Sequence, residues 1–343
     1  MSIEVFLDDT PGEVRGVVVR DGRFHNLLIQ REDADPAHRL GARLVGRVAT
    51  VVPGLKGAFV DLGAPLQGFL PFSTGSSLSV GEKLEVEVSA EPREQKGPTL
   101  RRVGAGEGEP RLLRAGPTVM DSLARLAPGA AVVTGVAAIR AAMEAEEAAM
   151  ACGELFPDTG LDLRVERTRA LVAVDLDLAP SAGVSGGAAA RTRANRQGLR
   201  EAARLIGLKR WGGLIAVDLI GAGHDGEAAL AAAKLAFAHY PEAVFGPVSR
   251  FGLMQFSIPW RMTPLEELLA GPDGVRRPEQ KAQDLVRALR LRLLSDTTAP
   301  RMQLRCAPAD GMRAAPGVAR LGPRAGLIPD PTIASGRFVI EET

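Results

Sequence analysis

The sequence predicts a multidomain protein of mixed α+β and α/β class, with a small β-barrel, an α/β core and a small C-terminal α/β domain. Two observations carry this prediction. Between residues 38 and 103, short runs of alternating apolar and polar residues are separated by Gly and Pro, which is typical of the strands of a small barrel. From residue 161 onward, strand-like and helix-like segments alternate, which is typical of an α/β layer.

We expect five parts along the 343 residues. They are N-terminal strands that pack with the core (1–36), the barrel (37–103), a reduced linker and helical subdomain (104–160), the α/β core (161–262) and the small C-terminal domain (263–343). Asp21-Gly22 between alternating runs predicts a hairpin turn. Barrel strands are expected over 42–52, 57–62, 68–71 and 83–90, helices over 137–150, 191–208 and 276–294, and terminal strands over 301–306 and 337–341.

The amino-acid composition limits which binding partners and which cellular compartment we expect. The 42 Lys and Arg against 41 Asp and Glu give a net charge of +1, so binding of a polyanion requires a local concentration of basic residues. Cys152 and Cys306 are the only cysteines and form no CxxC motif, which excludes a disulfide framework and a cysteine-type zinc site. The start has no signal-peptide pattern and no apolar stretch suits a bilayer, so we expect a cytoplasmic protein that does not enter a membrane.

Two strand-like segments carry acidic residues at their ends. Residues 171–177 read Leu-Val-Ala-Val-Asp-Leu-Asp, and residues 214–219 read Leu-Ile-Ala-Val-Asp-Leu. These apolar runs predict strands buried on both faces, and the helix expected between them predicts a parallel βαβ unit. Asp175 and Asp218 would then lie at equivalent heights near the carboxyl ends of neighbouring strands, with Asp177 on the same side of the sheet as Asp175.

Converging carboxylates predict a metal ion. They repel one another and lose hydration, and a hard divalent cation relieves both effects. We therefore expect Mg²⁺, or alternatively Mn²⁺, bound by Asp175 and Asp218, with Asp177 in a supporting catalytic role. The alternative is that each acid only caps a strand or the following helix.

The helix expected over 191–208 carries a row of arginines. Because these residues are spaced three, four and four apart, we expect them on one helix face, opposite the apolar face that packs on the sheet. They are Arg193, Arg196, Arg200 and Arg204. Beside a metal site such a row predicts contact with a nucleic-acid backbone, and a solvated face without a ligand is the alternative.

A glycine-rich segment gives a competing prediction. Gly221, Gly223 and Gly226 form G-x-G-x-x-G between a strand and a helix, the pattern of dinucleotide-binding enzymes. Two points count against it: the next strand lacks the expected acid at its end, and the acid on the preceding strand would lie close to a pyrophosphate. His224 and Asp225 in this segment would either approach the metal or lie in solvent.

Residues 56–63 read Lys-Gly-Ala-Phe-Val-Asp-Leu-Gly, and residues 68–71 read Gly-Phe-Leu-Pro. If alternate residues of this run fill the barrel core, Phe59 and Asp61 face outward, and an outward phenylalanine is a stacking platform for single-stranded nucleic acid. The alternative is a phenylalanine covered by a neighbouring domain. Together with segments 168–177, 211–220 and 249–257, these residues resemble the RNase E/G family, in which the segments have the same order.

The resemblance implies an OB-fold RNA-binding barrel and an α/β nuclease core with DNase-I-like and RNase-H-like elements. It implies an endoribonuclease that uses metal-activated water to hydrolyse phosphodiester bonds in single-stranded RNA, in RNA processing or decay. Asp175 and Asp218 would bind Mg²⁺, and Asp177 stands where the family more often has asparagine. The barrel residues expected to hold RNA are Lys56, Phe59, Phe69 and Lys96. A non-catalytic RNA-binding paralogue is the alternative.

Two departures from the family narrow these expectations. The stretch between Pro98 and Ala170 is short where larger members place a sensor for the five-prime end, and the sequence shows no counterpart of that pocket. After Arg261 the family has a paired-cysteine zinc link between subunits, and this chain has none. We therefore expect a shortened member without zinc, in which any homo-oligomer forms without a cysteine zinc link.

Overall fold

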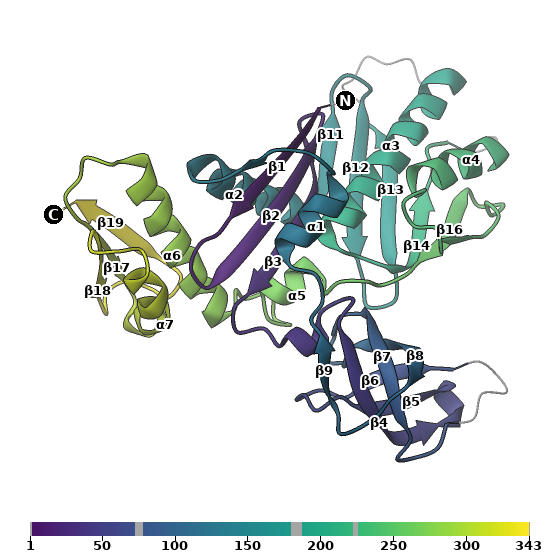
Figure 1. The fold of residues 1–343 in the computed structure, drawn as a ribbon. Helices are drawn as coiled ribbons and strands as arrows, with labels where there is room; N and C mark the ends of the chain where they lie inside the picture. The colour runs from purple at the N-terminus through teal and green to yellow at the C-terminus, as the bar shows by residue number, and fades with distance from the viewer. Residues whose placement is uncertain (1, 73–77, 180–186, 222–225, 343) are drawn as a thin grey trace. The chain divides into compact units, whose positions relative to one another are not determined.

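The computed structural model describes residues 2–72, 78–179, 187–221 and 226–342, and its fold is mixed α+β with several sheets (Figure 1). The chain divides into two compact units. Unit 1 comprises Met1–Glu146 and Thr263–Thr343, and unit 2 comprises Glu147–Met262. Within the described ranges, no helix is long and apolar enough to cross a membrane.

Unit 1 contains a closed barrel of five strands in the order β5-β6-β8-β7-β4, which closes because β4 also pairs with β5. β6 and β8 are parallel, and the other neighbours are antiparallel. This order is consistent with an OB-like barrel, and the closed barrel confirms that part of the fold prediction. The strands are β4 (Arg43–Val52), β5 (Gly57–Asp61), β6 (Gly68–Pro71), β7 (Lys83–Ala90) and β8 (Thr99–Ala105), with β9 (Arg111–Arg114) paired to β4 and two 3-10 helices, η1 (Pro36–His38) and η2 (Pro53–Leu55).

A second sheet of unit 1 has the order β10-β1-β2-β3. β1, β2 and β3 form an antiparallel meander, and β10, from the segment expected to be a linker and helical subdomain, adds in parallel to β1. Asp21 and Gly22 join β2 to β3 with φ of 46° and 73°, the two positive values of a two-residue hairpin turn, which confirms that prediction. The elements are β1 (Ile3–Asp8), β2 (Glu13–Arg20), β3 (Arg23–Arg31), α1 (Val119–Leu126), β10 (Val132–Val133) and α2 (Val136–Met150).

The last part of unit 1 contains a small sheet and three helices. β17 lies in the centre, parallel to β18 and antiparallel to β19, and Leu289, Leu304 and Val318 from α6, β17 and α7 share one core. These elements give the terminal segment its mixed helix and strand content. They are α5 (Leu265–Leu269), α6 (Pro278–Ser295), β17 (Met302–Cys306), α7 (Pro308–Ala319), β18 (Ala325–Pro329) and β19 (Phe338–Glu342).

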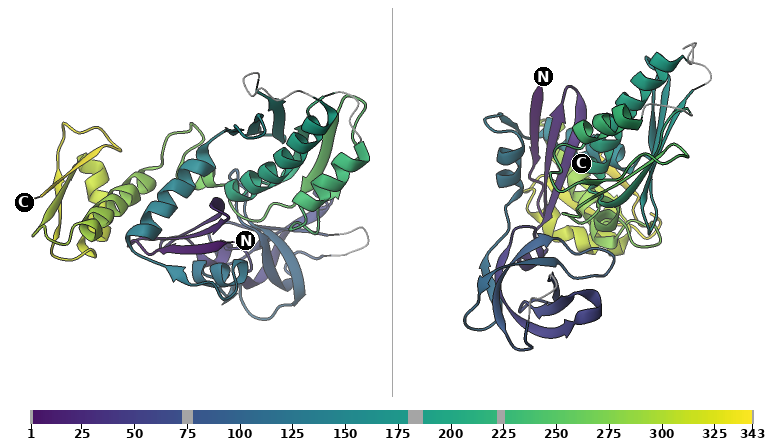
Figure 2. Two further views of the ribbon diagram at one scale, coloured as in Figure 1. Left: turned by 90° about the horizontal axis from the view of Figure 1, so that it is seen from above. Right: turned by 90° about the vertical axis from the view of Figure 1, so that its right-hand side faces the viewer.

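Unit 2 is a six-stranded sheet in the order β11-β12-β13-β14-β16-β15. Only β13 and β14 pair in parallel, and α3 makes the crossover between them, as the sequence predicts. α3 and α4 pack on the same face of the sheet (Figures 1 and 2). The elements are β11 (Gly153–Phe156), β12 (Leu161–Arg167), β13 (Val172–Leu178), α3 (Ala188–Lys209), β14 (Gly213–Asp218), α4 (Gly226–Ala236), β15 (Val244–Phe245) and β16 (Leu253–Ile258).

The expectation that the acidic strands are buried on both faces is wrong. Along β13, Val174 and Leu176 are buried, whereas Asp175 and Asp177 are exposed. α3 lies close on the buried side, because a Cβ on Gly198 would come within 2.6 Å of Leu176 Cδ2. The physical reason is the strand order: most neighbours in this sheet are antiparallel, and an antiparallel sheet can keep one face in solvent.

Candidate functional site

The acidic strand ends of unit 2 lie side by side. In the register of the parallel pair β13–β14, the Cα partner of Asp175 is Asp218. Both side chains are exposed and project from the face opposite α3, because residues paired in register share a face. Adjacent strands are about 4.8 Å apart, so the Cα atoms of Asp175 and Asp218 are direct neighbours across the two strands. The predicted juxtaposition of Asp175 and Asp218 is therefore present.

Two further acids share this face. Asp177 follows Asp175 by two residues on β13, and Asp162 on the antiparallel strand β12 is the Cα partner of Asp177. Loss of hydration raises the pKa of Asp175, as do the charges of Asp218, Asp177 and Asp162, while Arg164 opposes the rise. Like charges thus accumulate around Asp175. Asp162 was not among the predicted site residues, although alternation along β12 predicts that it faces outward.

These acids offer part of a metal site. Within the described residues, no three His, Cys, Asp or Glu side chains converge as a ready metal-binding group. Asp175 and Asp218 nevertheless match the one or two carboxylates that proteins usually give to Mg²⁺, the remaining positions being filled by water and substrate phosphate. His224 and Asp225, the other suggested ligands, lie outside the described residues.

The end of β14 is fixed by a buried amide that sequence reasoning missed. Asn195 on α3 accepts a hydrogen bond from Ile220 N at 2.9 Å and donates from Nδ2 to Ile220 O at 3.3 Å. The side-chain nitrogen and oxygen of Asn195 are therefore both bonded to the backbone of Ile220, two residues after Asp218. The available signal was a polar residue on the apolar side of a predicted helix. Asn195 therefore helps to hold the backbone beside the paired acids.

The arginine row of α3 divides into two parts. Arg193, Arg196 and Arg200 are exposed and, with Ala189 and Thr192, line a surface hollow of about 520 Å³. They form the exposed arginine row of this helix, a positive surface suited to phosphate.

Arg204 departs from the expectation of one shared, exposed face. It is only 8% exposed, and it pairs with Glu201 at 2.6 Å and with Glu154 at 3.1 Å. Its charge is committed to a structural ion pair.

The exposed arginine row does not lie beside the paired acids. α3 packs on the face of the sheet that carries Val174 and Leu176, and Asp175 projects from the other face. Exposed positions on α3 point away from the sheet, so the helix and the sheet both lie between the arginines and the carboxylates. The expectation of an arginine-lined face next to the metal is wrong within unit 2.

Two phenylalanines form an aromatic surface on the barrel. Phe59 on β5 and Phe69 on β6 are Cα partners, and their rings meet edge to face with centroids 5.5 Å apart. Both project outward and are partly exposed, since Ala58, Val60 and Leu70 fill the core between them. Oligonucleotide-binding barrels use this face, on the second and third strands.

Phe69 lies over bare backbone. A Cβ at Gly57 would come within 2.1 Å of Phe69 Cζ, so the position of this ring requires glycine at residue 57. The arrangement of the Phe59 and Phe69 rings therefore depends on the glycine at residue 57 of β5 as well as on the phenylalanines themselves.

The two predicted lysines lie in the connections that flank this surface. Lys56 ends η2 between β4 and β5 with φ of 49°, and its exposed side chain has no polar partner in the described part of the chain. Lys96 lies between β7 and β8, largely exposed, with Nζ 3.2 Å from Glu94. Phe69 N donates to Pro98 O at 2.8 Å, which holds the Lys96 connection against β6. Connections of these two types contact oligonucleotides in related barrels.

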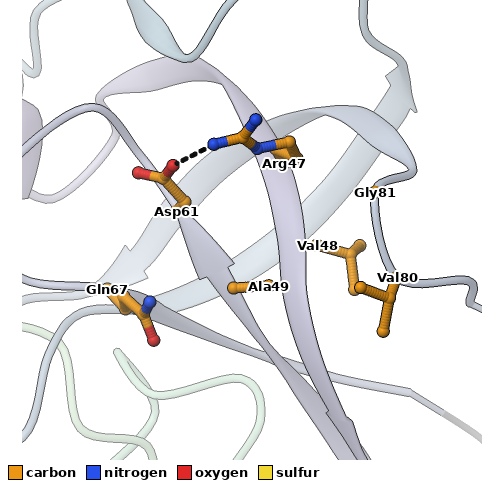
Figure 3. Close-up of a pocket in the computed structure, with 7 residues that line it drawn as sticks. All are labelled: Arg47, Val48, Ala49, Asp61, Gln67, Val80 and Gly81. Atoms are coloured by element: carbon orange, nitrogen blue, oxygen red, sulfur yellow. Dashed lines mark hydrogen bonds and ion pairs between the residues drawn. The ribbon is translucent and has the colours of Figure 1, made fainter.

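A second hollow of about 460 Å³ lies on the same barrel, near the start of β6 (Figure 3). Asp61 faces outward, as predicted, and accepts a hydrogen bond from Arg47 Nη2 at 3.1 Å. It also accepts from Gly63 N at 3.0 Å. Asp61 is therefore held by its neighbours, and it orients Arg47 beside Gln67 at the rim of the hollow.

Comparison of the sequence with protein-family models gives no match, and comparison with curated proteins finds none that is significantly similar. The likeness to the RNase E/G family therefore stays a prediction from motifs.

The topology counts against the dinucleotide-binding alternative. After Gly221 and α4, the chain enters β15, which has two residues and does not pair with β14. β16 lies between β14 and β15 and is antiparallel to both, whereas a dinucleotide-binding unit needs a parallel neighbour there. Gly223 lies outside the described residues.

Proposed function

We propose that this protein is a shortened member of the RNase E/G family that binds single-stranded RNA on its barrel and cleaves phosphodiester bonds with Mg²⁺ held at Asp175 and Asp218. One observation carries the proposal: the parallel register of β13 and β14, which pairs these two acids on one open face. Substitution of Mn²⁺ for Mg²⁺ is consistent with the same oxygen ligands.

The chemistry follows from the charges on that face. Asp175 and Asp218 repel each other, and a cation bound between them removes this repulsion while keeping open positions for water and phosphate. Mg²⁺ bound there would polarise the phosphoryl group and lower the pKa of a bound water. Asp177, two residues from Asp175, supports the site through its charge on the same face.

The barrel supplies RNA affinity in this proposal. Phe59 and Phe69 stack with bases, which tolerates different sequences because every base has an aromatic face. Lys56 and Lys96 contact the backbone phosphates. The exposed arginine row (Arg193, Arg196, Arg200) holds another part of the strand, whereas Arg204 has no role in RNA binding because its charge is already paired.

A cleavage assay tests the proposal. A labelled, unstructured RNA is incubated with the protein in Mg²⁺, in Mn²⁺ and in EDTA. We expect fragments with five-prime phosphates in either metal and none in EDTA. Phe59→Ala should weaken RNA binding about tenfold, because stacking on one aromatic contributes about 1–3 kcal/mol per base. Leu113→Ala, at an exposed apolar residue of β9, is the matched control and should bind normally.

A non-catalytic RNA-binding paralogue is the second candidate. The observation that favours it is the absence, within the described residues, of a third converging metal ligand. RNA binding without metal-dependent fragments in the same assay would select this candidate. For both candidates we propose a reducing cytoplasm, which the lack of a CxxC motif and the two free cysteines support.

A further inference from the structure

A tight turn precedes β16 and leads into the strand next to Asp218. Ser249 N donates to Leu253 O at 2.8 Å, and Gly252 N donates to Ser249 O at 3.0 Å. Ser249 Oγ accepts from Phe251 N at 3.3 Å and from Leu253 N at 3.2 Å. Gly252 has φ of 86°, which the turn needs and few other residues adopt. Four hydrogen bonds thus fix a turn of four residues.

This turn presents an aromatic ring and a cation. Phe251 is 75% exposed, in a protein with only 4% aromatic residues. The guanidinium of Arg250 lies over the ring, 4.8 Å from its centre. The pair thus offers a flat apolar surface and a positive charge from one rigid segment.

The turn lies at the same end of the sheet as the paired acids. Leu253 is the Cα partner of Asp218 in the antiparallel pair β14–β16. Phe251 precedes Leu253 by two residues, which corresponds to roughly 7 Å of chain at strand spacing. Because Leu253 pairs with Asp218 and Phe251 is two residues away, the turn lies next to the position of Asp218, at the end of the neighbouring strand.

We infer that Phe251 and Arg250 form a binding platform for the RNA nucleotide next to the cleaved phosphate, with the base stacked on Phe251 and a phosphate bound by Arg250. This inference rests on the proposed function and adds a binding subsite to it. Base stacking on an exposed ring and a charge from Arg250 suit single-stranded RNA of any sequence. Holding the adjacent nucleotide would place the scissile phosphate over the acids.

Cleavage kinetics of the full chain test the inference. Phe251→Ala should lower kcat/KM for a short RNA about tenfold, and Phe251→Tyr should restore it, because tyrosine retains the stacking surface. Arg250→Gln should reduce the salt dependence of RNA binding by about one unit of slope, the effect of losing one phosphate contact. Leu235→Ala, at a residue of α4 that is 78% exposed, is the matched control and should cleave normally.

Short RNAs with a single abasic nucleotide identify the contacted base. At one position beside the cleavage site, removal of the base should erase the difference between wild type and Phe251→Ala. The inference is overturned if Phe251→Ala cleaves like wild type, or if its defect persists with every abasic RNA.

A binding measurement separates this inference from the proposed function. RNA that carries a fluorescent adenine analogue should be quenched when its base stacks on Phe251, and Phe251→Ala should remove the quenching. Quenching without cleavage would reject the nuclease and support the platform, whereas cleavage without quenching at any position would support the nuclease and reject the platform.

Discussion

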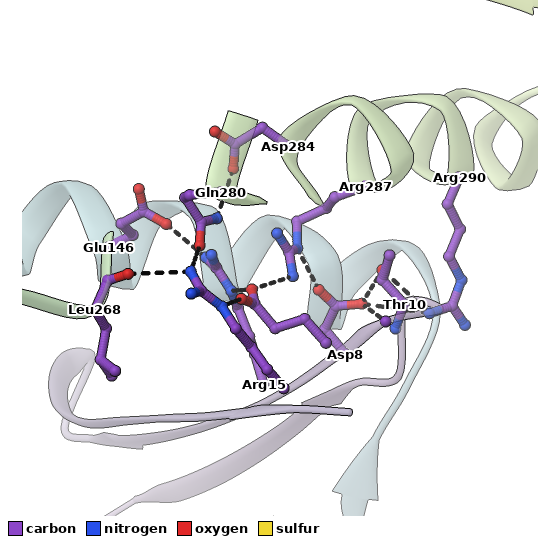
Figure 4. A network of polar contacts seen from close by, with 12 residues as sticks. Asp8, Thr10, Arg15, Glu146, Leu268, Gln280, Asp284, Arg287 and Arg290 are labelled. Carbon is purple, nitrogen blue, oxygen red and sulfur yellow. Dashed lines mark hydrogen bonds and ion pairs between the residues drawn. The ribbon is translucent and has the colours of Figure 1, made fainter. Parts of the chain in front are cut away.

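Two acidic clusters of this protein differ in what surrounds them. In unit 1, Glu13 is buried among arginines: Arg15 Nε donates to it at 2.7 Å and Arg287 Nη2 at 2.9 Å. Asp8 beside it accepts from Arg287 Nε at 2.7 Å, and Glu146 accepts from Arg15 Nη1 at 2.6 Å (Figure 4). In unit 2, by contrast, the closest charges around Asp175 are mostly those of other acids.

The pKa values move in opposite directions as a result. Burial alone would raise the pKa of Glu13, but the charges of Arg15, Arg287 and Arg31 lower it to about 2. The pKa of Asp175 is raised by lost hydration and by its acidic neighbours. An acid that the chain itself neutralises stabilises the fold. Acids that the chain leaves facing each other on an open sheet are suited to an external cation.

Asp218→Asn should give the largest effect on activity. Loss of one paired carboxylate should lower kcat/KM for RNA cleavage at least ~100-fold, since even residues that only support metal ligands contribute up to that factor. RNA affinity should stay within a few-fold, and the free energy of unfolding should not fall, because repulsion with Asp175 is removed. Cleavage and urea unfolding measure these effects, with Asp158→Asn as the control in the same unit. Unchanged cleavage would remove Asp218 from the mechanism.

Glu13→Gln should show the opposite pattern, with normal cleavage chemistry and a weaker fold. Removing one partner of a buried ion pair leaves Arg15 and Arg287 without their shared acid, which costs about 3 kcal/mol of unfolding free energy. Chemical denaturation monitors this change. Glu4→Gln, at an exposed residue of β1, is the matched control and should change stability little. Equal stability of the two variants would show that the network around Glu13 contributes nothing to the fold.

Lowering the pH should remove the contribution of Glu13 to the free energy of unfolding. Its folded pKa of about 2 lies below the ordinary value of 4.5, so its stabilisation is complete above pH 4.5 and is lost as pH falls from there toward 2. The integrated contribution is about 3 kcal/mol. Wild type and Glu13→Gln should therefore differ in unfolding free energy at neutral pH and converge at low pH. A constant difference across this range would contradict the assignment.

Mg²⁺ should stabilise unit 2 by a smaller amount. A cation at ten times its Kd adds about 1.4 kcal/mol if it binds only the folded state. The double variant Asp175→Asn, Asp218→Asn should lose this increment, whereas Glu13→Gln should keep it. Thermal unfolding with and without Mg²⁺ measures the shift. A shift that persists in the double variant would place the cation elsewhere.

Periodicity predicted the parts of the fold that depend on local alternation. The barrel strands from Gly57–Asp61 to Lys83–Ala90 and the helix Ala188–Lys209 lie close to their expected positions. The pairing of Asp175 with Asp218 also followed, because one crossover helix leaves few ways to place two parallel strands.

Contacts between distant segments were not predictable in the same way. Helical spacing put Arg204 in a row with Arg200, but in the fold Arg204 pairs with Glu154 of β11, which no local pattern reveals. β10 has two residues, too few for any periodicity, yet it extends the sheet of β1. The ion pairs of Arg287 with Asp8 and Glu13 join residues more than 270 positions apart, and sequence spacing carries no signal for them.

Because the Phe69 ring packs against Gly57, the addition of a single methyl group at residue 57 would change the aromatic surface of the barrel. Alanine at residue 57 would force its Cβ into the Phe69 ring, so the ring would have to move, which would change its edge-to-face contact with Phe59. Neither lysine of the flanking connections would change, nor would any charge. The angle between the two rings can therefore be altered without substituting either phenylalanine, because the backbone of β5 at residue 57 determines where the Phe69 ring lies.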